Sequence, residues 1–144
     1  MNVNEVVFEF LKMVGNHRRF GKMLYNHIEE PKEKPQKIFM LDDLREVGKA
    51  RLKDIALQTG HSTQNLCSLY NGLVKEGLVG REIDKNDRRN TYYFLTKKGE
   101  KTLDENQSKA RGVISATFSK LSEEDLNELK LCLENTNRII EKVL

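Results

Sequence analysis

The sequence is poor in the residues that usually form disulfide frameworks, metal centres and rigid turns. Its 144 residues include two cysteines, two prolines, three histidines and no tryptophan. Cys67 and Cys132 show none of the spacings typical of metal ligands, and a single pair of cysteines makes no disulfide framework. We therefore expect two reduced, mostly buried thiols, with a redox-sensing role as the lesser alternative.

The sequence also lacks the residue sets that enzymes commonly use. His17, His27 and His61 are scattered along the chain, whereas the ligands of a metal usually come in clusters. No Ser/His/Asp or Cys/His set suggests an activated nucleophile, and there is no glycine-rich phosphate loop. We therefore expect a protein that is not an enzyme, with no catalytic residues, no metal and no cofactor.

Long apolar runs are absent as well. No stretch reaches the length of a membrane span, and no charged-then-apolar leader with a cleavage site is found. We therefore expect a cytoplasmic protein without a membrane partner. The 33% charged and 38% hydrophobic residues are typical of a soluble, helix-rich protein, and 144 residues suffice for one domain with a hydrophobic core.

Positive charge is concentrated in the middle of the chain. The net charge is +3, yet residues 49–101 alone carry eleven basic and six acidic side chains. A basic segment of this kind is typical of a surface that contacts a polyanion. A solvated surface can have the same composition, so the charge alone does not decide the function.

The spacing of apolar residues predicts six helices. The first covers about residues 4–28, and a linker at 29–36 with Pro31 and Pro35 follows it. The next three helices are expected at 36–47, 51–59 and 62–76, and the last two after Thr96 and at 123–143. On the second helix we expect five residues on the buried side, namely Ile38, Phe39, Leu41, Leu44 and Val47.

Residues 51–76 have the pattern of a helix-turn-helix. Gly60 supplies the tight backbone of the turn, and Ser62 is a favourable N-cap for the longer second helix. In such motifs the N-terminal part of the second helix meets base edges, and amide or hydroxyl side chains bond to bases or phosphates. The candidate DNA-binding residues are Ser62, Thr63, Gln64, Asn65 and Ser68. Taken alone, these residues fit the ordinary capping of a packed helical hairpin equally well.

A β-hairpin is expected directly after this motif. Its strands at 79–83 and 91–95 are rich in β-branched and aromatic residues and flank a polar loop. The loop carries Lys85, Asp87, Arg88 and Arg89. Arginine enters the narrow, negative minor groove of DNA well, and a nearby aspartate can orient its guanidinium group. A charged tip directly after a helix-turn-helix favours a winged helix over a solvated turn.

At these residues the chain resembles the MarR family of winged-helix transcriptional regulators. The resemblance rests on residues 51–100, especially on KEGLV before the wing, Asp87-x-Arg89 within it and LTKKG after it. It implies a mainly α fold with a small β-hairpin wing, in which a winged helix-turn-helix is flanked by N- and C-terminal dimerisation helices. Residues 1–144 would form a single domain, with the DNA-binding part at 36–101 and the dimerisation helices at 1–35 and 102–144.

The resemblance also implies a function. Members of the family bind double-stranded DNA as homodimers, with the recognition helix in the major groove and a wing arginine in the minor groove. Many members release DNA when a small molecule binds. We therefore expect a homodimeric repressor of transcription that reads a near-palindromic site, with a small-molecule effector as a further candidate partner. The amphipathic terminal helices independently favour a dimer, because they carry more apolar surface than one small domain covers.

Two positions depart from the family pattern. Ser68 and Gly72 stand where the recognition helix commonly carries basic residues. The phosphate contacts would then depend more on Arg51, Lys53, Lys75, Arg81 and the cations of the wing. The departure keeps open an alternative function, that of a winged-helix protein-interaction module without DNA binding. We expect Phe10, Met13, Phe20, Met23, Phe39 and Met40 in the core rather than in a pocket. If an effector cavity exists between the dimerisation helices and the DNA-binding part, the residues placed to line it are Phe20, Met23, Phe39 and Met40.

Overall fold

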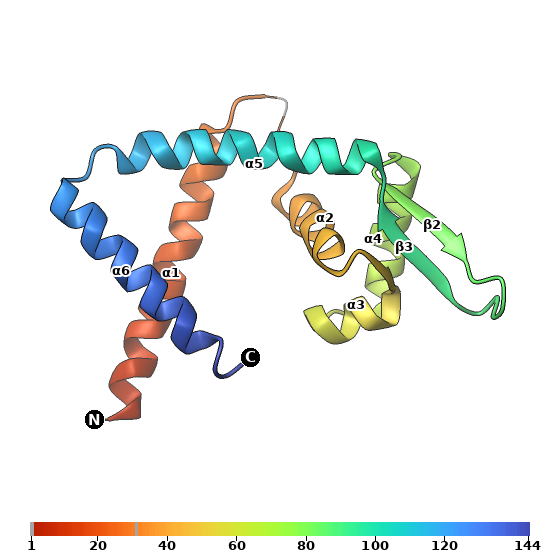
Figure 1. The fold of residues 1–144 in the computed structure, drawn as a ribbon, viewed down its shortest axis with the longest axis horizontal. Coiled ribbons are helices and arrows are strands. Elements are labelled where there is room, and N and C mark those ends of the chain that lie inside the picture. The colour runs from red at the N-terminus through yellow and green to blue at the C-terminus, as the bar shows by residue number, and fades with distance from the viewer. Residues whose placement is uncertain (1, 31) are drawn as a thin grey trace. The chain divides into compact units, whose positions relative to one another are not determined.

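The computed structural model describes residues 2–30 and 32–144, so Pro31 lies outside the described chain. These residues form six helices and three strands (Figure 1). In chain order they are α1 (Val3–His27), α2 (Pro35–Val47), β1 (Lys49–Arg51), α3 (Leu52–Thr59), α4 (Thr63–Lys75), β2 (Val79–Ile83), β3 (Thr91–Leu95), α5 (Lys97–Phe118) and α6 (Glu123–Ile140). The six expected helices and both strands of the hairpin are therefore present.

The chain divides into two compact units, which we call the helical unit and the winged unit. The helical unit contains α1 through Ile28 together with Ala110–Leu144, and the winged unit contains Glu29–Lys109. Helix α5 contributes residues to both units. The helix-turn-helix and the hairpin therefore belong to one unit.

Helix boundaries follow capping residues that are visible in the sequence. Helix α2 starts with Pro35, at a position where the missing N–H group is not needed. Ser62 and Ser122 are the N-caps of α4 and α6, and each side chain accepts a hydrogen bond from a first-turn N–H group. Helix α3 ends at Gly60, whose φ of 73° is left-handed and therefore suits glycine.

A third strand, β1, joins the hairpin and was not expected from the sequence. The antiparallel sheet has the order β1-β3-β2, and Tyr93 in its central strand pairs with Ala50 on one side and Arg81 on the other. The predicted start of a helix at Arg51 is wrong by one residue, because Arg51 ends β1 and α3 starts at Leu52. The sequence Lys-Ala-Arg has no β-branched or aromatic side chain, so its strand conformation depends on pairing with β3.

The core of the winged unit lies between α2, α4, α5 and the sheet. Its most deeply buried side chains are Tyr70, Leu41, Leu44, Leu66, Leu103 and Val79. The hydroxyl group of Tyr70 donates a hydrogen bond of 3.2 Å to the carbonyl oxygen of Met40, and its ring lies 5.6 Å from that of Tyr93. Burial raises the pKa of Tyr70 to about 12, so the hydroxyl remains a donor at neutral pH. This bond ties α4 to α2.

Two residues of α2 that were predicted to be buried are exposed. Leu41 and Leu44 are fully buried, but Phe39 and Val47 expose 68% and 37% of their surface. Met40 is only 8% exposed, as expected for a core residue, although it was not among the five residues placed on the buried side of this helix. Phe39 points away from the stripe formed by Met40, Leu41 and Leu44, because each residue turns the helix by about 100°. Val47 is the last residue of the helix.

The segments KEGLV and LTKKG meet where α4 ends and α5 begins. Thr96 donates from its backbone N–H to the carbonyl oxygen of Leu78 at 3.1 Å and from its hydroxyl to that of Gly77 at 2.6 Å. The same hydroxyl accepts a hydrogen bond of 3.0 Å from the N–H of Gly99, so Thr96 caps α5 as predicted. A Cβ atom at Gly99 would overlap the carbonyl oxygen of Leu78. The junction therefore requires glycine at this position.

The helical unit leaves many apolar side chains exposed. Neither α1 nor α6 contains a buried residue. The rings of Phe20 and Phe118 lie 5.8 Å apart and join α1 to α5. The exposed apolar residues on the two helices include Val6, Val7, Phe10, Leu11, Val14, Leu133 and Ile139. Their apolar faces are thus left largely uncovered within this unit.

Both cysteines are exposed, which corrects the expectation of mostly buried thiols. On α4 the buried positions are Leu66, Tyr70 and Leu73. Cys67 follows Leu66 and is rotated from it by about 100° around the helix, which takes it off the buried stripe. Cys132 lies on α6, a helix without buried residues. The expectation had followed the general tendency of cysteine to be buried rather than the position of either residue.

Candidate nucleic-acid interface

The N-terminal turn of α4 presents a row of polar side chains. Ser62 begins it, and its Oγ atom accepts a hydrogen bond of 3.3 Å from the N–H of Asn65. Thr63, Gln64, Asn65 and Ser68 are exposed, as is Ser62 itself. The free N–H groups and the positive end of the helix dipole lie at the same end of the helix. Each of the five predicted residues is therefore available to a ligand.

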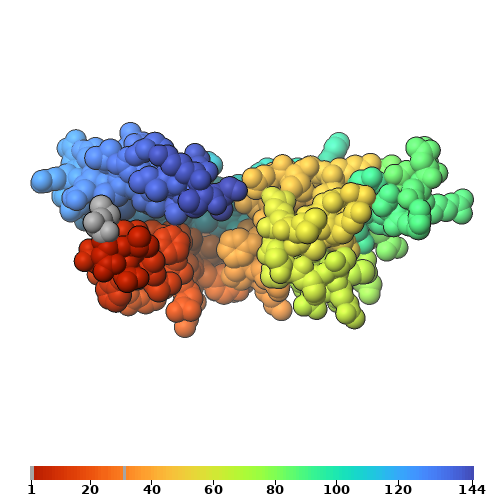
Figure 2. Space-filling view, turned by 90° about the horizontal axis from the view of Figure 1, so that it is seen from below, coloured from red at the N-terminus to blue at the C-terminus, as the bar shows by residue number. Residues whose placement is uncertain are grey.

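The opposite face of α4 is fixed in the core. Leu66, Tyr70 and Leu73 expose 2%, 0% and 4% of their surface. Figure 2 shows α3 and α4 (yellow to yellow-green) at the surface of the winged unit, and the hairpin (green) projecting beside them. The buried face prevents rotation of α4, so its polar face keeps a constant direction relative to the hairpin.

The tip of the hairpin is an ordered turn. The N–H of Asp84 donates to the carbonyl oxygen of Asn90 at 2.9 Å, and the N–H of Asn90 donates to that of Asp87 at 2.9 Å. The carboxylate of Asp84 accepts a further hydrogen bond of 2.8 Å from the N–H of Asn86. Lys85 and Arg88 are exposed on this turn. The loop thus has its own hydrogen bonds and can present its cations in a defined arrangement.

Arg89 projects from the hairpin and is held at its base by Asp87. The Nε atom of Arg89 donates to Oδ1 of Asp87 at 3.1 Å, and its backbone N–H donates to the same oxygen at 3.1 Å. Two hydrogen bonds from Arg89 keep the pKa of Asp87 below its ordinary value, the larger effect coming from the side chain and the smaller from the backbone. The Arg89 side chain is 90% exposed. An exposed pair of this kind adds little stability, so we interpret Asp87 as orienting the guanidinium group.

A hollow of about 310 Å³ lies between α4 and the hairpin. Arg51 lines it from the end of β1 and Lys53 from the start of α3. Thr63 and Cys67 line it from α4, and Arg89 lines it from the hairpin. Cys67 was expected to be buried and is not among the predicted site residues. Its place in the hollow depends on the tertiary contact between helix and hairpin, which no local sequence pattern reveals.

Three cationic side chains therefore converge between the first turn of α4 and the hairpin. Arg51 is held by Asp54, with its Nε and Nη2 atoms 2.8 Å and 3.2 Å from the carboxylate oxygens. The hydrogen bond from Arg51 lowers the pKa of Asp54, which stays ionised at neutral pH. With Lys53 and Arg89, Arg51 forms a positive rim around a helix N-terminus. This arrangement suits the phosphate groups of a polyanion.

Gly72 lies on α4 in open space, and a methyl group added there would meet no heavy atom within 4 Å. Glycine inside a helix costs about 0.5–1 kcal/mol relative to alanine. We expect Gly72→Ala to raise the free energy of unfolding by about that amount, measured by urea denaturation of the DNA-free protein. A loss of stability would show that the helix needs glycine for a reason other than space.

The four residues suggested for an effector cavity line hollows in both units. Phe39 and Met40 line a cavity of the winged unit, whereas Met23 and Phe20 line two hollows of the helical unit. Within residues 2–30 and 32–144, no group of three or more histidine, cysteine, aspartate or glutamate side chains could hold a metal ion. No helix in the same ranges is both long and apolar enough to cross a membrane.

Solved structures share this fold over nearly the full chain. A MarR family protein from Bacillus stearothermophilus has a TM-score of 0.74 and 19% identity, and the alignment covers 98% of this chain and 99% of that one. Bordetella bronchiseptica BpsR, described with regulation of its DNA binding by 6-hydroxynicotinic acid, has a TM-score of 0.63 and 21% identity, over 91% and 98% of the two chains. A mutant of Escherichia coli MarR complexed with operator DNA has a TM-score of 0.66 and 15% identity, over 92% and 96%.

The comparisons of sequence give no match. No protein-family model and no curated protein matches the chain. The structural similarity shows that the chain has the winged helix-turn-helix fold found in MarR proteins.

Proposed function

We propose that this chain is a homodimeric, sequence-specific, double-stranded DNA-binding regulator of transcription. Helix α4 would enter the major groove, where Gln64 and Asn65 would contact the bases, and Arg89 would enter the adjacent minor groove. Two copies would place their recognition helices about 34 Å apart, which suits a near-palindromic site. We further propose that it acts as a repressor in the cytoplasm and releases DNA when a small-molecule effector binds.

The observation that carries this proposal is the single face shared by the α4 terminus and the hairpin. Thr63 of α4 lines a hollow together with Arg51, Lys53 and Arg89. The other polar residues at the start of this helix are exposed, namely Ser62, Gln64, Asn65 and Ser68. Polar side chains at a helix N-terminus can read bases, while the surrounding cations contact phosphates. The fold adds support, because it is shared with a protein described in complex with operator DNA.

Fluorescence anisotropy with the DNA upstream of the chain's own gene tests the proposal. Binding should exceed that of a scrambled duplex and should weaken steeply between about 50 and 200 mM salt, because each neutralised phosphate releases counterions. Absence of binding at about 50 mM salt to upstream or scrambled DNA would favour the protein-interaction module. That second function is considered because the middle of α4 is neutral, since Ser68 and Gly72 carry no charge.

Substitution of the two amide side chains on α4 should alter base preference. We expect Gln64→Ala and Asn65→Ala each to weaken binding of a dimer to the specific site by about 30-fold or more, since a lost base contact costs about 1–3 kcal/mol and the dimer loses two of them. Binding to the scrambled duplex should change little, because phosphate contacts remain. Equal losses on both duplexes in the anisotropy assay would contradict a role in reading bases.

The dimer is proposed from the uncovered apolar faces of α1 and α6. Neither helix has a buried residue, and Leu11 and Ile139 expose 63% and 53% of their surface. Apolar surface of this extent on two helices of one unit is typical of an interface between proteins. Figure 1 shows both chain ends in this unit, so a second copy would involve the N- and C-terminal helices.

Light scattering should give a mass about twice the 16.7 kDa of one chain. Leu11→Asp should shift the mass toward one chain, because a charge buried in an apolar interface is costly. Leu57→Asp is the matched control, since Leu57 is 85% exposed on α3 in the winged unit. A parent protein with the mass of one chain would contradict the dimer.

A further inference from the structure

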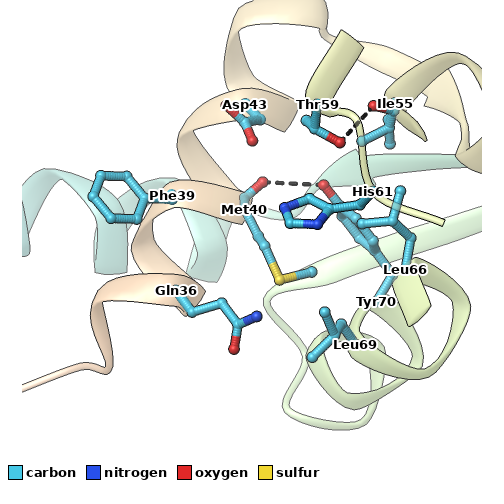
Figure 3. A pocket seen from close by; sticks show the side chains of 10 residues that line it. All are labelled: Gln36, Phe39, Met40, Asp43, Ile55, Thr59, His61, Leu66, Leu69 and Tyr70. Carbon is cyan, nitrogen blue, oxygen red and sulfur yellow. Dashed lines mark hydrogen bonds between the residues drawn. The ribbon is translucent and has the colours of Figure 1, made fainter. Parts of the chain in front are cut away.

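A second cavity lies in the winged unit where α2, α3 and α4 meet. It has a volume of about 330 Å³, and its apolar walls include Met40 of α2 and Leu66 and Leu69 of α4 (Figure 3). Asp43 and His61 contribute polar groups to the same lining. The volume lies at the small end of the range for ligand sites, about 300–1,000 Å³, which suits a ligand with one ring.

Two of the other four polar side chains in this lining, those of Tyr70 and Thr59, already have hydrogen-bond partners. The Tyr70 hydroxyl donates to the carbonyl oxygen of Met40, and the Thr59 hydroxyl donates to that of Ile55 at 2.8 Å; Figure 3 marks both bonds. Asp43 differs from them. Its carboxylate is half-buried and makes no hydrogen bond or ion pair with any residue that the structure describes. A half-buried acceptor at the edge of an apolar cavity is a suitable partner for a donor group.

The charges around Asp43 select the kind of donor. Burial raises the pKa of Asp43, Asp42 and Glu46 raise it further by repulsion, and His61 opposes them. Arg45, the basic residue nearest to it in the sequence of α2, donates instead to the carboxylate of Asp104 at 2.7 Å. The field at this end of the cavity is therefore negative, which favours a cation over a neutral donor and disfavours an anion.

We propose that the cavity binds a small aromatic amine, with its ring between Met40, Leu66 and Leu69 and its ammonium group against Asp43. The methionine thioether makes favourable contacts with aromatic rings, and the ammonium group would give the carboxylate the hydrogen-bonded ion pair that it lacks among the described residues. The occupant would touch α4 on the side opposite to its polar row. Any effect of the amine on DNA affinity rests on the proposed function, but binding to the cavity does not.

Calorimetry on the full-length, DNA-free protein tests this site with three probes of similar shape. 2-Phenylethylamine should bind with a dissociation constant below about 1 mM, a modest affinity for nine non-hydrogen atoms. 2-Phenylethanol should bind about 10-fold more weakly and phenylacetate more weakly still, because a charge-assisted hydrogen bond is stronger than a neutral one. Equal binding of phenylacetate and the amine, or no binding of the amine at about 10 mM, would overturn the proposal.

Three substitutions locate the amine. Asp43→Asn should weaken the amine by about 10-fold and leave 2-phenylethanol unchanged within about 2-fold. Glu46→Gln removes the same charge from the same helix but outside the cavity lining, and it should change the affinity for the amine by no more than about 2-fold.

Leu69→Phe fills the cavity and should therefore weaken the binding of both the amine and 2-phenylethanol. If Asp43→Asn and Glu46→Gln had equal effects, the amine would respond to the general field and the site would be wrong. Failure of DNA binding in the anisotropy assay would leave these results unaffected.

Discussion

Replacing Arg89 by alanine is expected to weaken DNA binding by about 100-fold for a dimer, which loses one arginine from each wing. A hydrogen-bonded charge contributes about 1.5 kcal/mol or more, and two such losses correspond to about two factors of ten. Arg89 is 90% exposed and oriented by Asp87 at 3.1 Å, so its removal should not disturb the fold. The slope of log affinity against log salt should become shallower by about 2, because two phosphate contacts are lost.

The matched control for this experiment is Arg111→Ala. Arg111 is an exposed arginine of α5 in the helical unit, outside the α4 and hairpin face. Both variants lower the net charge of the chain equally, so a non-specific effect of charge would appear in both. Affinity and salt slope of Arg89→Ala equal to those of Arg111→Ala would show that the wing does not contact DNA.

Gly99→Ala is expected to destabilise the protein strongly. A methyl group at this position would overlap the carbonyl oxygen of Leu78, which is backbone and itself accepts the hydrogen bond from Thr96. Overpacking against a backbone atom costs about 3 kcal/mol or more, the upper part of the usual range. Urea denaturation of the DNA-free protein measures the loss, which should appear as a lower midpoint.

Gly72→Ala is the control for Gly99→Ala, because it makes the same change inside a helix where nothing lies within 4 Å. The two substitutions are expected to have opposite signs, with a small gain at 72 and a large loss at 99. If Gly99→Ala were as stable as the parent, the junction between KEGLV and LTKKG could not be as closely packed as the contact with Leu78 requires.

Features set by local patterns could be predicted from the sequence. Gly60, Ser62 and Ser122 mark helix ends through backbone conformation and capping, which act within a few residues. The two strands of the hairpin were also predicted within their observed bounds, 79–83 and 91–95, because their composition contrasts with the loop between them. The exposure of the predicted residues on α4 follows in the same way from the apolar spacing on its other face.

Features that depend on distant contacts could not be predicted. Strand β1 forms because Ala50 pairs with Tyr93, more than forty residues later in the chain. Met40 rather than Phe39 faces the core, and both are large and apolar, so helical spacing alone does not separate them. The need for Gly99 arises from the carbonyl oxygen of Leu78, which directly precedes β2 and lies more than twenty residues earlier in the chain. The exposure of Cys67 and Cys132 was likewise missed, because cysteine content gives no direction around a helix.

Alkylation of the two cysteines tests most directly whether the α4 and hairpin face binds DNA. Cys67 lies in the hollow between α4 and the hairpin, whereas Cys132 lies on α6 in the helical unit, and the chain has no other cysteine. The rates of reaction with N-ethylmaleimide can be followed for both by mass spectrometry, with and without the upstream duplex. At about nine-tenths occupancy the rate at Cys67 should fall about 10-fold, while the rate at Cys132 should stay within about 2-fold. Unchanged reactivity of Cys67 in a protein that is bound to DNA would contradict the proposed interface.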